Sequence, residues 1–471
     1  MMVAARAATE FRPRRRIATE LTRRKRLVQG AVAKHSLVVG LGATGVAAAR
    51  YLIGRGERVR VIDSRAVPPG LAELRKACPD AEIALETLDH RWLDDASRVL
   101  LSPGLGYDIP LAREARRRGI AVVGDIELFA LAAEAPVVAV TGSNGKSTVT
   151  TLTALMLQAQ GLRAPAGGNL GPPALDLLEL PADVYVLEIS SFQMETTDSL
   201  APLAAAVLNV SPDHLDRHGT LELYAELKEK LLAAADIGVY NADDPLVASM
   251  GARHARGVPF SAARELPRGY SVVTRHGERW LARDLEPLLR CAELGVRGTH
   301  NEANALASLA LTAQLTKDLA ASLRVLKTFS GLPHRCQRVA ERGGVTFVDD
   351  SKGTNVGATL AAIHGLDGPL VLIAGGLAKG QDLTPLAAGS KSKVRAAVLI
   401  GEAAPELEHV LAGVCPTLRA ATMDDAVRAA AELARRGDTV LLSPACASQD
   451  MFRDYKERGE IFARAARGLP E

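Results

Sequence analysis

One stretch of the sequence has the residue types that hold nucleotide phosphates. VVAVTGSNGKSTVT, Val137–Thr150, passes from an apolar segment into a Gly-rich turn, then Lys-Ser-Thr, then a potential helix. Backbone amides of such a turn cradle phosphates, its lysine reaches the β- and γ-phosphates, and a hydroxyl holds Mg²⁺. The GxxxxGK[ST] pattern is incomplete because Val140 replaces its first glycine. The predicted phosphate loop comprises Gly142, Ser143, Asn144, Gly145, Lys146, Ser147 and Thr148.

A second Gly-rich loop occurs earlier in the chain. GLGATG (Gly40–Gly45) follows a strand-like run and opens a helix-like one, and Asp63 ends the next strand-like run. An acidic residue about 20 residues after such a loop is typical of dinucleotide-binding folds. On its own the loop indicates a diphosphate held at a helix N-terminus, as in NAD sites. A tight strand–helix turn without a ligand is the alternative.

Other polar residues follow apolar strands or lie on a predicted helix. Glu188 ends the run VYVLE, where a carboxylate is either a metal ligand or a costly buried charge, and we favour the ligand. His214 follows another strand, in NVSPDHLDRHG, where a solvated loop is the alternative. Lys228, in YAELKEKLL, is predicted on a solvated helix face. His300 and Asn301 could cap a helix over NEANALASLALTAQL or reach a base and ribose.

The C-terminal third places further polar residues after predicted strands. Their motifs are LPHR, DDSKGTN, GGLAKGQD and SPACASQDMFRDYK. Cations gathered at strand ends across a cleft suit an anionic substrate and developing phosphate charge. The candidates here are His334, Arg335, Asp350, Lys352, Thr354, Asn355, Lys379, Ser448 and Tyr455.

Composition narrows the class of protein. The chain has 471 residues, 48% hydrophobic but only 4% aromatic, which favours aliphatic α/β cores over an all-β fold. At roughly 100–200 residues per domain this length gives two to four domains. A net charge of +3 does not argue for nucleic acid or a membrane surface, and no apolar run reaches membrane-spanning length. Five scattered cysteines without a C-x-x-C pair indicate a reducing, cytoplasmic setting.

The order of short apolar runs and helical stretches predicts an α/β fold with three tandem domains. Strand–helix–strand order implies parallel sheets with crossover helices. The predicted boundaries are 35–133, 134–330 and 331–471, with SGLPHR as the second linker. Residues 1–34 are strongly basic and are predicted to be a disordered extension. A contact with an acidic partner and a transit peptide are the alternatives for that arm.

Taken together, the motifs resemble one family, the Mur ligases of peptidoglycan synthesis. The resemblance runs from about residue 36 to near the C-terminus, and its specificity comes from the order and spacing of the motifs. TGSNGKST and HNEANA resemble motifs that Mur ligases share with folylpolyglutamate synthases. DSKGTN and SPACAS resemble the D-glutamate-adding member of the family. The further motifs are GGNLGPPAL, LEISSFQMETT, LNVSPDHLDRH, NADDP, GTHNEANAL and GLPHR.

The resemblance implies a fold and a reaction. The fold is a Rossmann-like N-terminal domain, a central P-loop-type ATPase domain and a Rossmann-like C-terminal domain. The reaction is ATP-dependent addition of D-glutamate to UDP-N-acetylmuramoyl-L-alanine through an acyl phosphate, by a cytoplasmic monomer. The implied cofactors are ATP and two Mg²⁺ ions, with Mn²⁺ as a possible substitute. Another Mur ligase or a folylpolyglutamate synthase-like amide ligase is the alternative.

Site residues carry over from the resemblance motif by motif. ATP would be held by the phosphate loop with Asn301, Asn304, Arg335 and Asp350. The metal ligands would be Ser147, Glu188, His214 and Lys228, the last carbamylated, which overturns its solvated-face interpretation. The UDP-substrate would contact Gly42, Thr44, Asp63, Ser64, Arg65, Ser102, Gly104, Asn169 and His214. D-glutamate would contact Lys352, Thr354, Lys379, Ser448 and Tyr455. The catalytic set would be Lys146, Glu188, His214, Lys228 and Lys352.

The sequence departs from the family pattern at two places near the predicted D-glutamate site. Leu377 and Ala378 stand where many relatives carry an acidic residue before the lysine of GGLAKG. Tyr455 stands where an aromatic residue without a hydroxyl also occurs. Two rival functions remain: an NAD-dependent dehydrogenase, which would not explain the Lys146 loop, and a non-catalytic nucleotide-binding scaffold.

Overall fold

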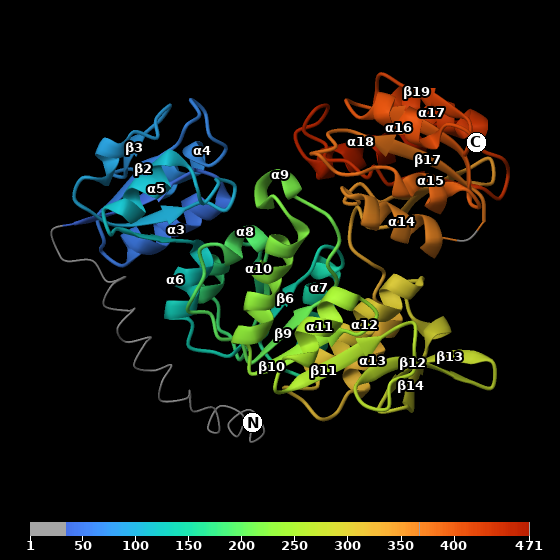
Figure 1. The fold of residues 1–471 in the computed structure, drawn as a ribbon, viewed down its shortest axis with the longest axis horizontal. Helices are drawn as coiled ribbons and strands as arrows, with labels where there is room; N and C mark the ends of the chain where they lie inside the picture. Colours follow the sequence, from blue (N-terminus) through green and yellow to red (C-terminus); the bar gives the residue numbers. More distant parts are fainter. Residues whose placement is uncertain (1–33, 367, 471) are drawn as a thin grey trace.

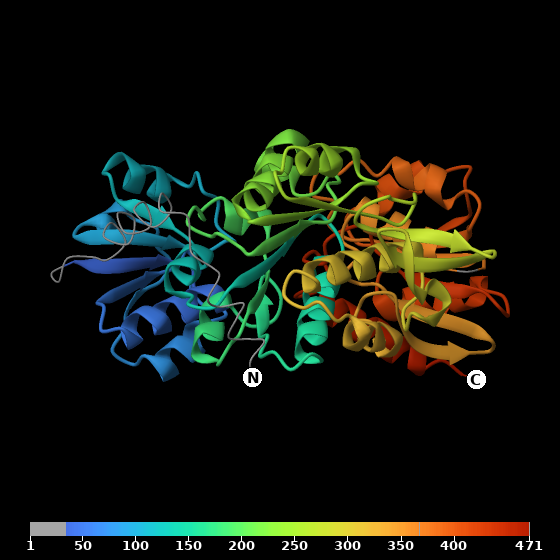
Figure 2. The ribbon, with the colours of Figure 1, turned by 90° about the horizontal axis from the view of Figure 1, so that it is seen from below.

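The computed structural model describes residues 34–366 and 368–470, which form three lobes, each built on one sheet (Figure 1). The three lobes follow one another in sequence order along the molecule when it is viewed from below (Figure 2). The predicted basic extension lies, apart from Lys34, outside the described residues, so its disorder stays a prediction. No helix among the described residues is long and apolar enough to cross a membrane.

The first lobe is a five-stranded parallel sheet in the order β3-β2-β1-β4-β5. This is the Rossmann strand order without its sixth strand, which agrees with the predicted Rossmann-like domain. The strands are β1 (His35–Val39), β2 (Val59–Ile62), β3 (Glu82–Ala84), β4 (Ala96–Leu101) and β5 (Ala121–Val123). The helices are α3 (Ala43–Gly54), α4 (Leu71–Ala77) and α5 (Pro110–Arg117). The short strand β3 was not predicted, because its three residues show no apolar run.

The central lobe has a nine-stranded sheet in the order β14-β13-β12-β11-β10-β9-β6-β8-β7. Its first strands are β6 (Val137–Thr141), β7 (Ala166–Gly168), β8 (Tyr185–Glu188), β9 (Ala204–Val207) and β10 (Ile237–Asn241). The others are β11 (Gly257–Ser261), β12 (Tyr270–Arg275), β13 (Glu278–Arg283) and β14 (Glu286–Arg290), of which β13 and β14 are antiparallel. The sequence prediction missed these last four strands. Arginines and glutamates interrupt the apolar pattern of β13 and β14, and glycine and proline interrupt that of β11.

Helices cover the central sheet. They are α7 (Lys146–Gln158), α8 (Ser191–Met194), α9 (Leu215–His218), α10 (Leu221–Ala234), α11 (Pro245–Ala252), α12 (Thr299–Thr312) and α13 (Ala320–Thr328). Helix α6 (Asp125–Ala132) follows the first lobe but packs on the short helix η2 (Ala174–Glu179) of the central lobe. Its Phe129 meets Tyr185 of β8 edge to face, with ring centroids 5.1 Å apart. The connection between the first two lobes is therefore part of a hydrophobic core.

The third lobe has a six-stranded sheet in the order β15-β16-β20-β17-β18-β19, parallel except for β15. Its strands are β15 (Gln337–Arg342), β16 (Val345–Asp349), β17 (Leu370–Gly375), β18 (Val394–Ile400), β19 (Thr417–Arg419) and β20 (Thr439–Leu442). Its helices are α14 (Val356–Gly365), α15 (Pro385–Ser390), α16 (Ala404–Leu411), α17 (Met423–Leu433) and α18 (Tyr455–Arg467). The predicted three-domain α/β architecture is confirmed, while the domain boundaries stay a prediction.

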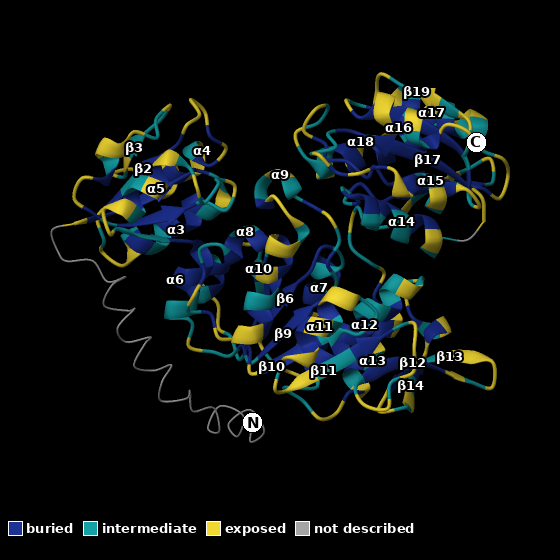
Figure 3. Ribbon diagram, in the orientation of Figure 1, coloured by how far each residue is buried: buried dark blue, intermediate teal, exposed yellow. Residues whose placement is uncertain are grey.

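The sheets are buried between their helices, as the dark strands in Figure 3 show. Their cores are aliphatic, built from Val, Leu, Ile and Ala, which agrees with the low aromatic content. Parallel strands covered on both faces read as continuous apolar runs, and this pattern made them predictable. Because all parallel strands of a sheet end at one edge, the loops that follow them gather there.

Asp125, the first residue of α6, is a buried carboxyl beneath the connection between the first two lobes. Burial raises the pKa of Asp125 to about 6, and Nε2 of Gln193 donates to its Oδ2 at 3.2 Å. As pH rises from 4 through 6, the carboxyl ionises in the unfolded chain before it does in the folded protein. The free energy of unfolding therefore falls over this window, by about 3 kcal/mol for a shift of roughly two units.

We expect Asp125→Asn to remove this pH dependence. Asparagine has the same shape, still accepts from Gln193 and carries no charge. The variant should be more stable than the unmodified protein at pH 8, and this advantage should disappear near pH 4. Thermal unfolding of both proteins at the two pH values measures the difference, with exposed Asp108→Asn as the control. An advantage of equal size at both pH values would contradict the prediction.

Candidate active site

The phosphate loop forms as predicted, between β6 and α7. Gly145 is the N-cap of α7 in a left-handed conformation, φ 84°, and a Cβ there would lie 2.5 Å from Oδ1 of Asn304. Only glycine satisfies both conditions. Nζ of Lys146 donates to the carbonyls of Gly142 and Ser143, at 2.8 and 2.9 Å. Burial lowers the pKa of Lys146, so the folded protein without a bound anion disfavours the charge of its ammonium.

Glu188 lies beside this loop because β8 pairs with β6 in the sheet, with Glu188 opposite Val140. The residue is 2% exposed. Nδ2 of Asn169 donates to Oε1 at 2.5 Å, whereas Oε2 is buried without a hydrogen-bond partner in the described part of the chain. A buried carboxylate oxygen with no donor is costly unless a cation meets it, so this site fits Mg²⁺. Asn169, predicted for the UDP-substrate, lies against Glu188.

Glu188 is not surrounded by a preformed group of metal-ligating side chains in the part of the chain that the structure describes. Among residues 34–366 and 368–470, no three His, Cys, Asp or Glu side chains are grouped as metal ligands. A metal ion at Glu188 would thus need oxygens from the Ser147 hydroxyl, the nucleotide or a modified lysine. This is the kind of site in which Mg²⁺ is bound by one or two carboxylates together with phosphates.

The interpretation of Lys228 as part of a solvated helix face is wrong, because the residue is only 1% exposed. It lies on the face of α10 that also buries Tyr224 and Leu231. Its Nζ donates to the carbonyl of Gly142 at 3.1 Å and lies 4.0 Å from the centre of the Tyr224 ring. Burial, and then the charge of Lys146, lower the pKa of Lys228 well below its ordinary value. An amine with such a pKa is a nucleophile at neutral pH.

His214 lies at the N-cap of α9 in a left-handed conformation, φ 55°. The centres of its ring and the Phe192 ring lie 4.8 Å apart, and its Nε2 is 3.6 Å from Oδ1 of Asp213. Burial lowers the pKa of His214, which favours the neutral imidazole that can bind a metal. Nδ2 of Asn355, from the third lobe, donates to Oδ2 of Asp213 at 3.0 Å.

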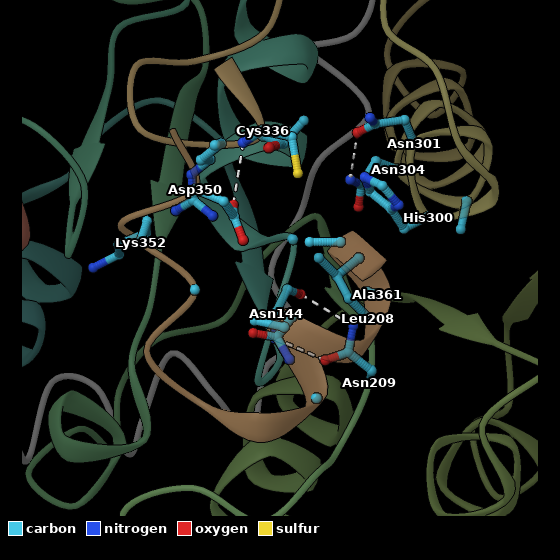
Figure 4. A pocket seen from close by; sticks show the side chains of 18 of the residues that line it. Asn144, Leu208, Asn209, His300, Asn301, Asn304, Cys336, Asp350, Lys352 and Ala361 are labelled. Carbon is cyan, nitrogen blue, oxygen red and sulfur yellow. Dashed lines mark hydrogen bonds between the residues drawn. The ribbon is translucent and has the colours of Figure 1, made fainter. Parts of the chain in front are cut away.

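Most of the residues predicted to bind the nucleotide line a cavity of about 370 Å³ between the central and third lobes (Figure 4). Asn301 and Asn304 extend from the same face of α12, and Nδ2 of Asn304 donates to Oδ1 of Asn301 at 3.3 Å. The capping interpretation of His300 and Asn301 was wrong: Gly298 is the N-cap, so both residues lie inside the helix. Predicted residues that line the cavity are Asn144, Gly145, Thr148, Asn301, Asn304, Arg335, Asp350 and Lys352.

The linker between these lobes brings Arg335 onto the phosphate loop. Its Nη2 donates to Oγ of Ser147 at 2.6 Å. Asp350, at the end of β16, accepts from Oγ of Ser443 at 2.7 Å and from the amide of Cys336 at 3.2 Å. Burial raises the pKa of Asp350 to about 7. Gly142, Ser143, Lys146 and Ser147 are outside the cavity lining but continue the same loop.

The predicted D-glutamate residues come from four segments of the third lobe. Nζ of Lys352 lies 4.1 Å from the centre of the Tyr455 ring. Burial lowers the pKa of Lys352 to about 8. The charges of Arg335 and Lys146 also lower this pKa, whereas the charge of Glu188 raises it. The backbone of Lys379 is in the left-handed conformation, φ 53°, and the positive charge of its side chain lowers the pKa of His214. Ser448 is buried. The backbone amide of Thr354 donates a hydrogen bond to the carbonyl of Lys352 at 2.8 Å.

The first lobe brings its predicted UDP-substrate residues to the carboxyl edge of its sheet. Gly42 and Thr44 open α3, Ser64 follows β2, and Ser102 and Gly104 follow β4. The hydrogen bonds of Asp63 weigh equally against a contact with the ribose of NAD and against its predicted contact with the UDP-substrate. Its two oxygens already accept from Arg65 and from the amide of Leu41, and hydrogen bonds from Arg65 lower the pKa of Asp63 to about 2.

Helix α9 lies between the first and third lobes (Figure 1). Nη1 of Arg217 on this helix donates to the carbonyl of Pro103 in the loop after β4, at 2.8 Å. The same guanidinium pairs with Glu195 and lies 4.2 Å from the centre of the Phe192 ring. Arg217 therefore joins the predicted sugar-binding loop of the first lobe to the region of His214.

Three residues of the site, Asn209, Asn241 and Asp244, were not predicted, and neither was the contact of the candidate Asn355 with Asn144. Oδ1 of Asn209 accepts from the amide of Asn144 at 2.7 Å, and Asn355 exchanges side-chain hydrogen bonds with Asn144 across the two lobes. Asn241 and Asp244 line the nucleotide cavity. Each lies in or beside a motif that drew attention for other residues. Their own signal was the position after a strand, which also located Glu188 and His214.

Comparison with known proteins agrees with this arrangement. The family descriptions "Mur ligase MurD-like, N-terminal domain", "Mur ligase middle domain" and "Mur ligase, glutamate ligase domain" match residues 34–124, 140–312 and 334–446. The UDP-N-acetylmuramoylalanine–D-glutamate ligase of Methylococcus capsulatus is 49% identical over 92% of this chain and 94% of its own. Its namesake from Pseudomonas aeruginosa is 47% identical over 92% of this chain and 98% of its own.

Solved structures share the fold at lower identity. The UDP-N-acetylmuramate–alanine ligase of Thermotoga maritima is similar with a TM-score of 0.62 and 19% identity, covering 92% of this chain and 99% of its own. MurF of Acinetobacter baumannii is similar with a TM-score of 0.58 and 17% identity, covering 92% and 91%. These structures support the three-domain α/β fold alone, whereas the sequence relatives establish the family. The chain belongs to the Mur ligase family, among the relatives named UDP-N-acetylmuramoylalanine–D-glutamate ligase.

Proposed function

We propose that this enzyme joins D-glutamate to UDP-N-acetylmuramoyl-L-alanine at the expense of ATP, in the synthesis of peptidoglycan precursors. The observation that carries the proposal is the convergence of the lobes on one phosphate loop. Arg335 of the linker contacts Ser147, and the charges of Glu188 and Lys146 act on Lys352 of the third lobe. This arrangement belongs to a chain whose relatives of that name align over nine-tenths of its length.

The reaction follows from what each group can do. A carboxylate oxygen of the UDP-substrate attacks the γ-phosphorus, the bond to the β-phosphate breaks, and ADP leaves. The amine of D-glutamate then attacks the acyl carbon, a tetrahedral intermediate forms, and phosphate leaves as the amide is made. The ammonium of D-glutamate loses one proton to water before the attack, and its nitrogen loses a second to the departing phosphate or to water as the amide forms. A carboxylate is a poor electrophile, and the phosphate converts it into a good one.

The side chains of the site act mainly through charge and position. Lys146 and Arg335 neutralise phosphate charge as it moves to the transferred group. When bound, Mg²⁺ shields the phosphate oxygens from one another, and Mn²⁺ could substitute for it. Glu188 with Ser147 would hold one ion, and His214 with a carbamylated Lys228 the other. The lowered pKa of His214 keeps its imidazole available for this role.

The remaining assignments divide the substrates among the lobes. The first-lobe loops and Asn169 would hold the UDP-sugar. The cavity between the central and third lobes would hold the nucleotide, and the cationic side chains of the third lobe would hold D-glutamate. The lobes would correspond to domains 35–133, 134–330 and 331–471. We also propose that the enzyme is a cytoplasmic monomer that uses ATP and two Mg²⁺ ions.

A coupled phosphate-release assay tests the function. We expect release only when ATP, Mg²⁺, UDP-N-acetylmuramoyl-L-alanine and D-glutamate are all present. The same assay with L-lysine, meso-diaminopimelate or a folate acceptor separates the other amide ligases, since turnover with one of these and none with D-glutamate would reject the assignment. Turnover that requires NAD rather than ATP would identify a dehydrogenase.

A further inference from the structure

Arg458 is the largest fully buried side chain in the described part of the chain, and the proposed reaction does not use it directly. It lies in the first turn of α18, one turn after Tyr455. Burying a cation is costly unless its donors are satisfied. Burial lowers the pKa of Arg458 to about 10, which leaves the guanidinium charged at neutral pH. Its donors must therefore find partners inside the lobe.

The donors of Arg458 reach two of the loops that carry predicted D-glutamate residues. Nε donates to Oγ of Ser351 at 2.9 Å, and Nη2 donates to the carbonyl of Ser351 at 2.8 Å. Nη1 donates to the carbonyl of Cys446 at 3.1 Å. Ser351 immediately precedes Lys352, and Cys446 precedes Ser448 by two positions. One planar group thus holds the backbone beside both side chains.

A third loop is packed against the same guanidinium. A Cβ on Gly376 would lie 3.3 Å from Nη1 of Arg458 and 2.1 Å from the carbonyl oxygen of Ala447. Leu377 and Ala447 exchange backbone hydrogen bonds at 3.0 Å in both directions. The loop that begins at Gly376 carries Lys379. Glycine is needed here, at φ 127°, because any side chain would push the loops apart.

Helix α18 completes the cluster. Oγ of Ser351 donates to the carbonyl of Tyr455 at 2.8 Å while it accepts from Arg458. The segments bearing Lys352, Thr354, Lys379, Ser448 and Tyr455 therefore all meet at one buried side chain. Lysine lacks the planar fork needed to donate in three directions, and an apolar residue of the same volume would leave two carbonyls without donors.

We propose that Arg458 is the positioning residue of the D-glutamate site. It sets the spacing of the three loops whose side chains would bind the amino acid, without touching the amino acid itself. The inference rests on the proposed function, because the D-glutamate assignment of those loops does.

The test is a steady-state comparison of Arg458→Lys with the unmodified enzyme for each substrate separately. Loss of charged, buried hydrogen bonds that orient the loops should raise KM for D-glutamate about ten-fold or more. KM for the UDP-substrate should change by less than about three-fold, since its predicted residues lie on other segments. KM for ATP should rise less than KM for D-glutamate, because only Asp350 and Lys352 of the predicted residues that line the nucleotide cavity belong to the loop that Arg458 holds. In Arg458→Ala, millimolar guanidinium should restore part of the D-glutamate affinity, because it supplies the missing donors.

Two further variants keep the test independent of folding. Ser351→Ala removes a single acceptor, so it should raise KM for D-glutamate less, and its effect should not add to that of Arg458→Lys. Arg395→Met is the matched control: it breaks another ion pair of the third lobe, in which Nε of Arg395 is 2.6 Å from Oδ2 of Asp438, away from these loops. It should leave KM for D-glutamate unchanged.

The outcomes separate the inference from the function. If the unmodified enzyme shows no D-glutamate-dependent phosphate release, the proposed function fails and the loops lose their assignment. If the unmodified enzyme is active but Arg458→Lys leaves KM for D-glutamate unchanged, or raises all three KM values equally, the positioning role is wrong.

Discussion

Replacing Lys146 with methionine should lower kcat/KM for ligation about a thousand-fold, since one charge aimed at a transferring phosphate contributes roughly this much. Lys146 is the ammonium of the phosphate loop and is held by the carbonyls of Gly142 and Ser143. Methionine keeps the length and apolar stem but removes the charge. KM for D-glutamate should change little, because that substrate would bind in the third lobe.

Stability measurements separate this loss of activity from unfolding. Burial lowers the pKa of Lys146, so folding already disfavours its charge. Lys146→Met should therefore melt at the same temperature as the unmodified protein or higher. Lys327→Met, at a half-exposed lysine of α13 paired with Glu293, is the control and should retain full activity. A folded Lys146→Met enzyme with less than about ten-fold loss would rule out the phosphate role.

Substituting alanine for Lys228 is expected to abolish nearly all activity, about a hundred-fold or more, with recovery on adding formate, acetate or propionate. An uncharged, buried amine attacks CO₂, loses a proton and becomes a carbamate. This change turns a neutral amine beside the phosphate loop into an anion that can ligate Mg²⁺. The geometry fits, because Nζ of Lys228 lies 3.1 Å from the carbonyl of Gly142. A small carboxylate could enter the space that alanine leaves and supply the same charge.

The control for this experiment is Lys230→Ala. Lys230 lies two positions along the same helix and pairs with Asp198 at the surface, so its loss should cost little activity and show no response to carboxylates. Lys228→Arg should be inactive and unresponsive, because a guanidinium does not form a carbamate and leaves no space. A folded Lys228→Ala protein that carboxylic acids fail to reactivate would count against the carbamate.

Lys228 and His300 show where sequence patterns misled. Helical periodicity treats every lysine as polar, so a lysine turned toward the phosphate loop looks like a solvated one. Periodicity does not distinguish the two cases, whereas its neighbours in the structure, Tyr224 and the carbonyl of Gly142, show that the lysine is buried. The capping prediction at His300 failed for a local reason, since Gly298 already supplies the turn into α12 with φ 100°. The strands β13 and β14 were missed because exposed, charged residues interrupt their apolar pattern where the sheet reaches its edge.

The sequence by itself determined the α/β class, the two Gly-rich loops and the strand ends at which Glu188, His214 and Asp350 stand. These features depend on local order: a parallel strand must end at the same edge as its neighbours, and the left-handed turn at Gly145, which has no room for a Cβ, requires glycine. Only the tertiary structure decided which groups meet across the lobes. The contact of Arg335 with Ser147 depends on how separate sheets pack together. So does the link of Arg217 to Pro103. Such contacts join residues distant in sequence, and no spacing along the chain records them.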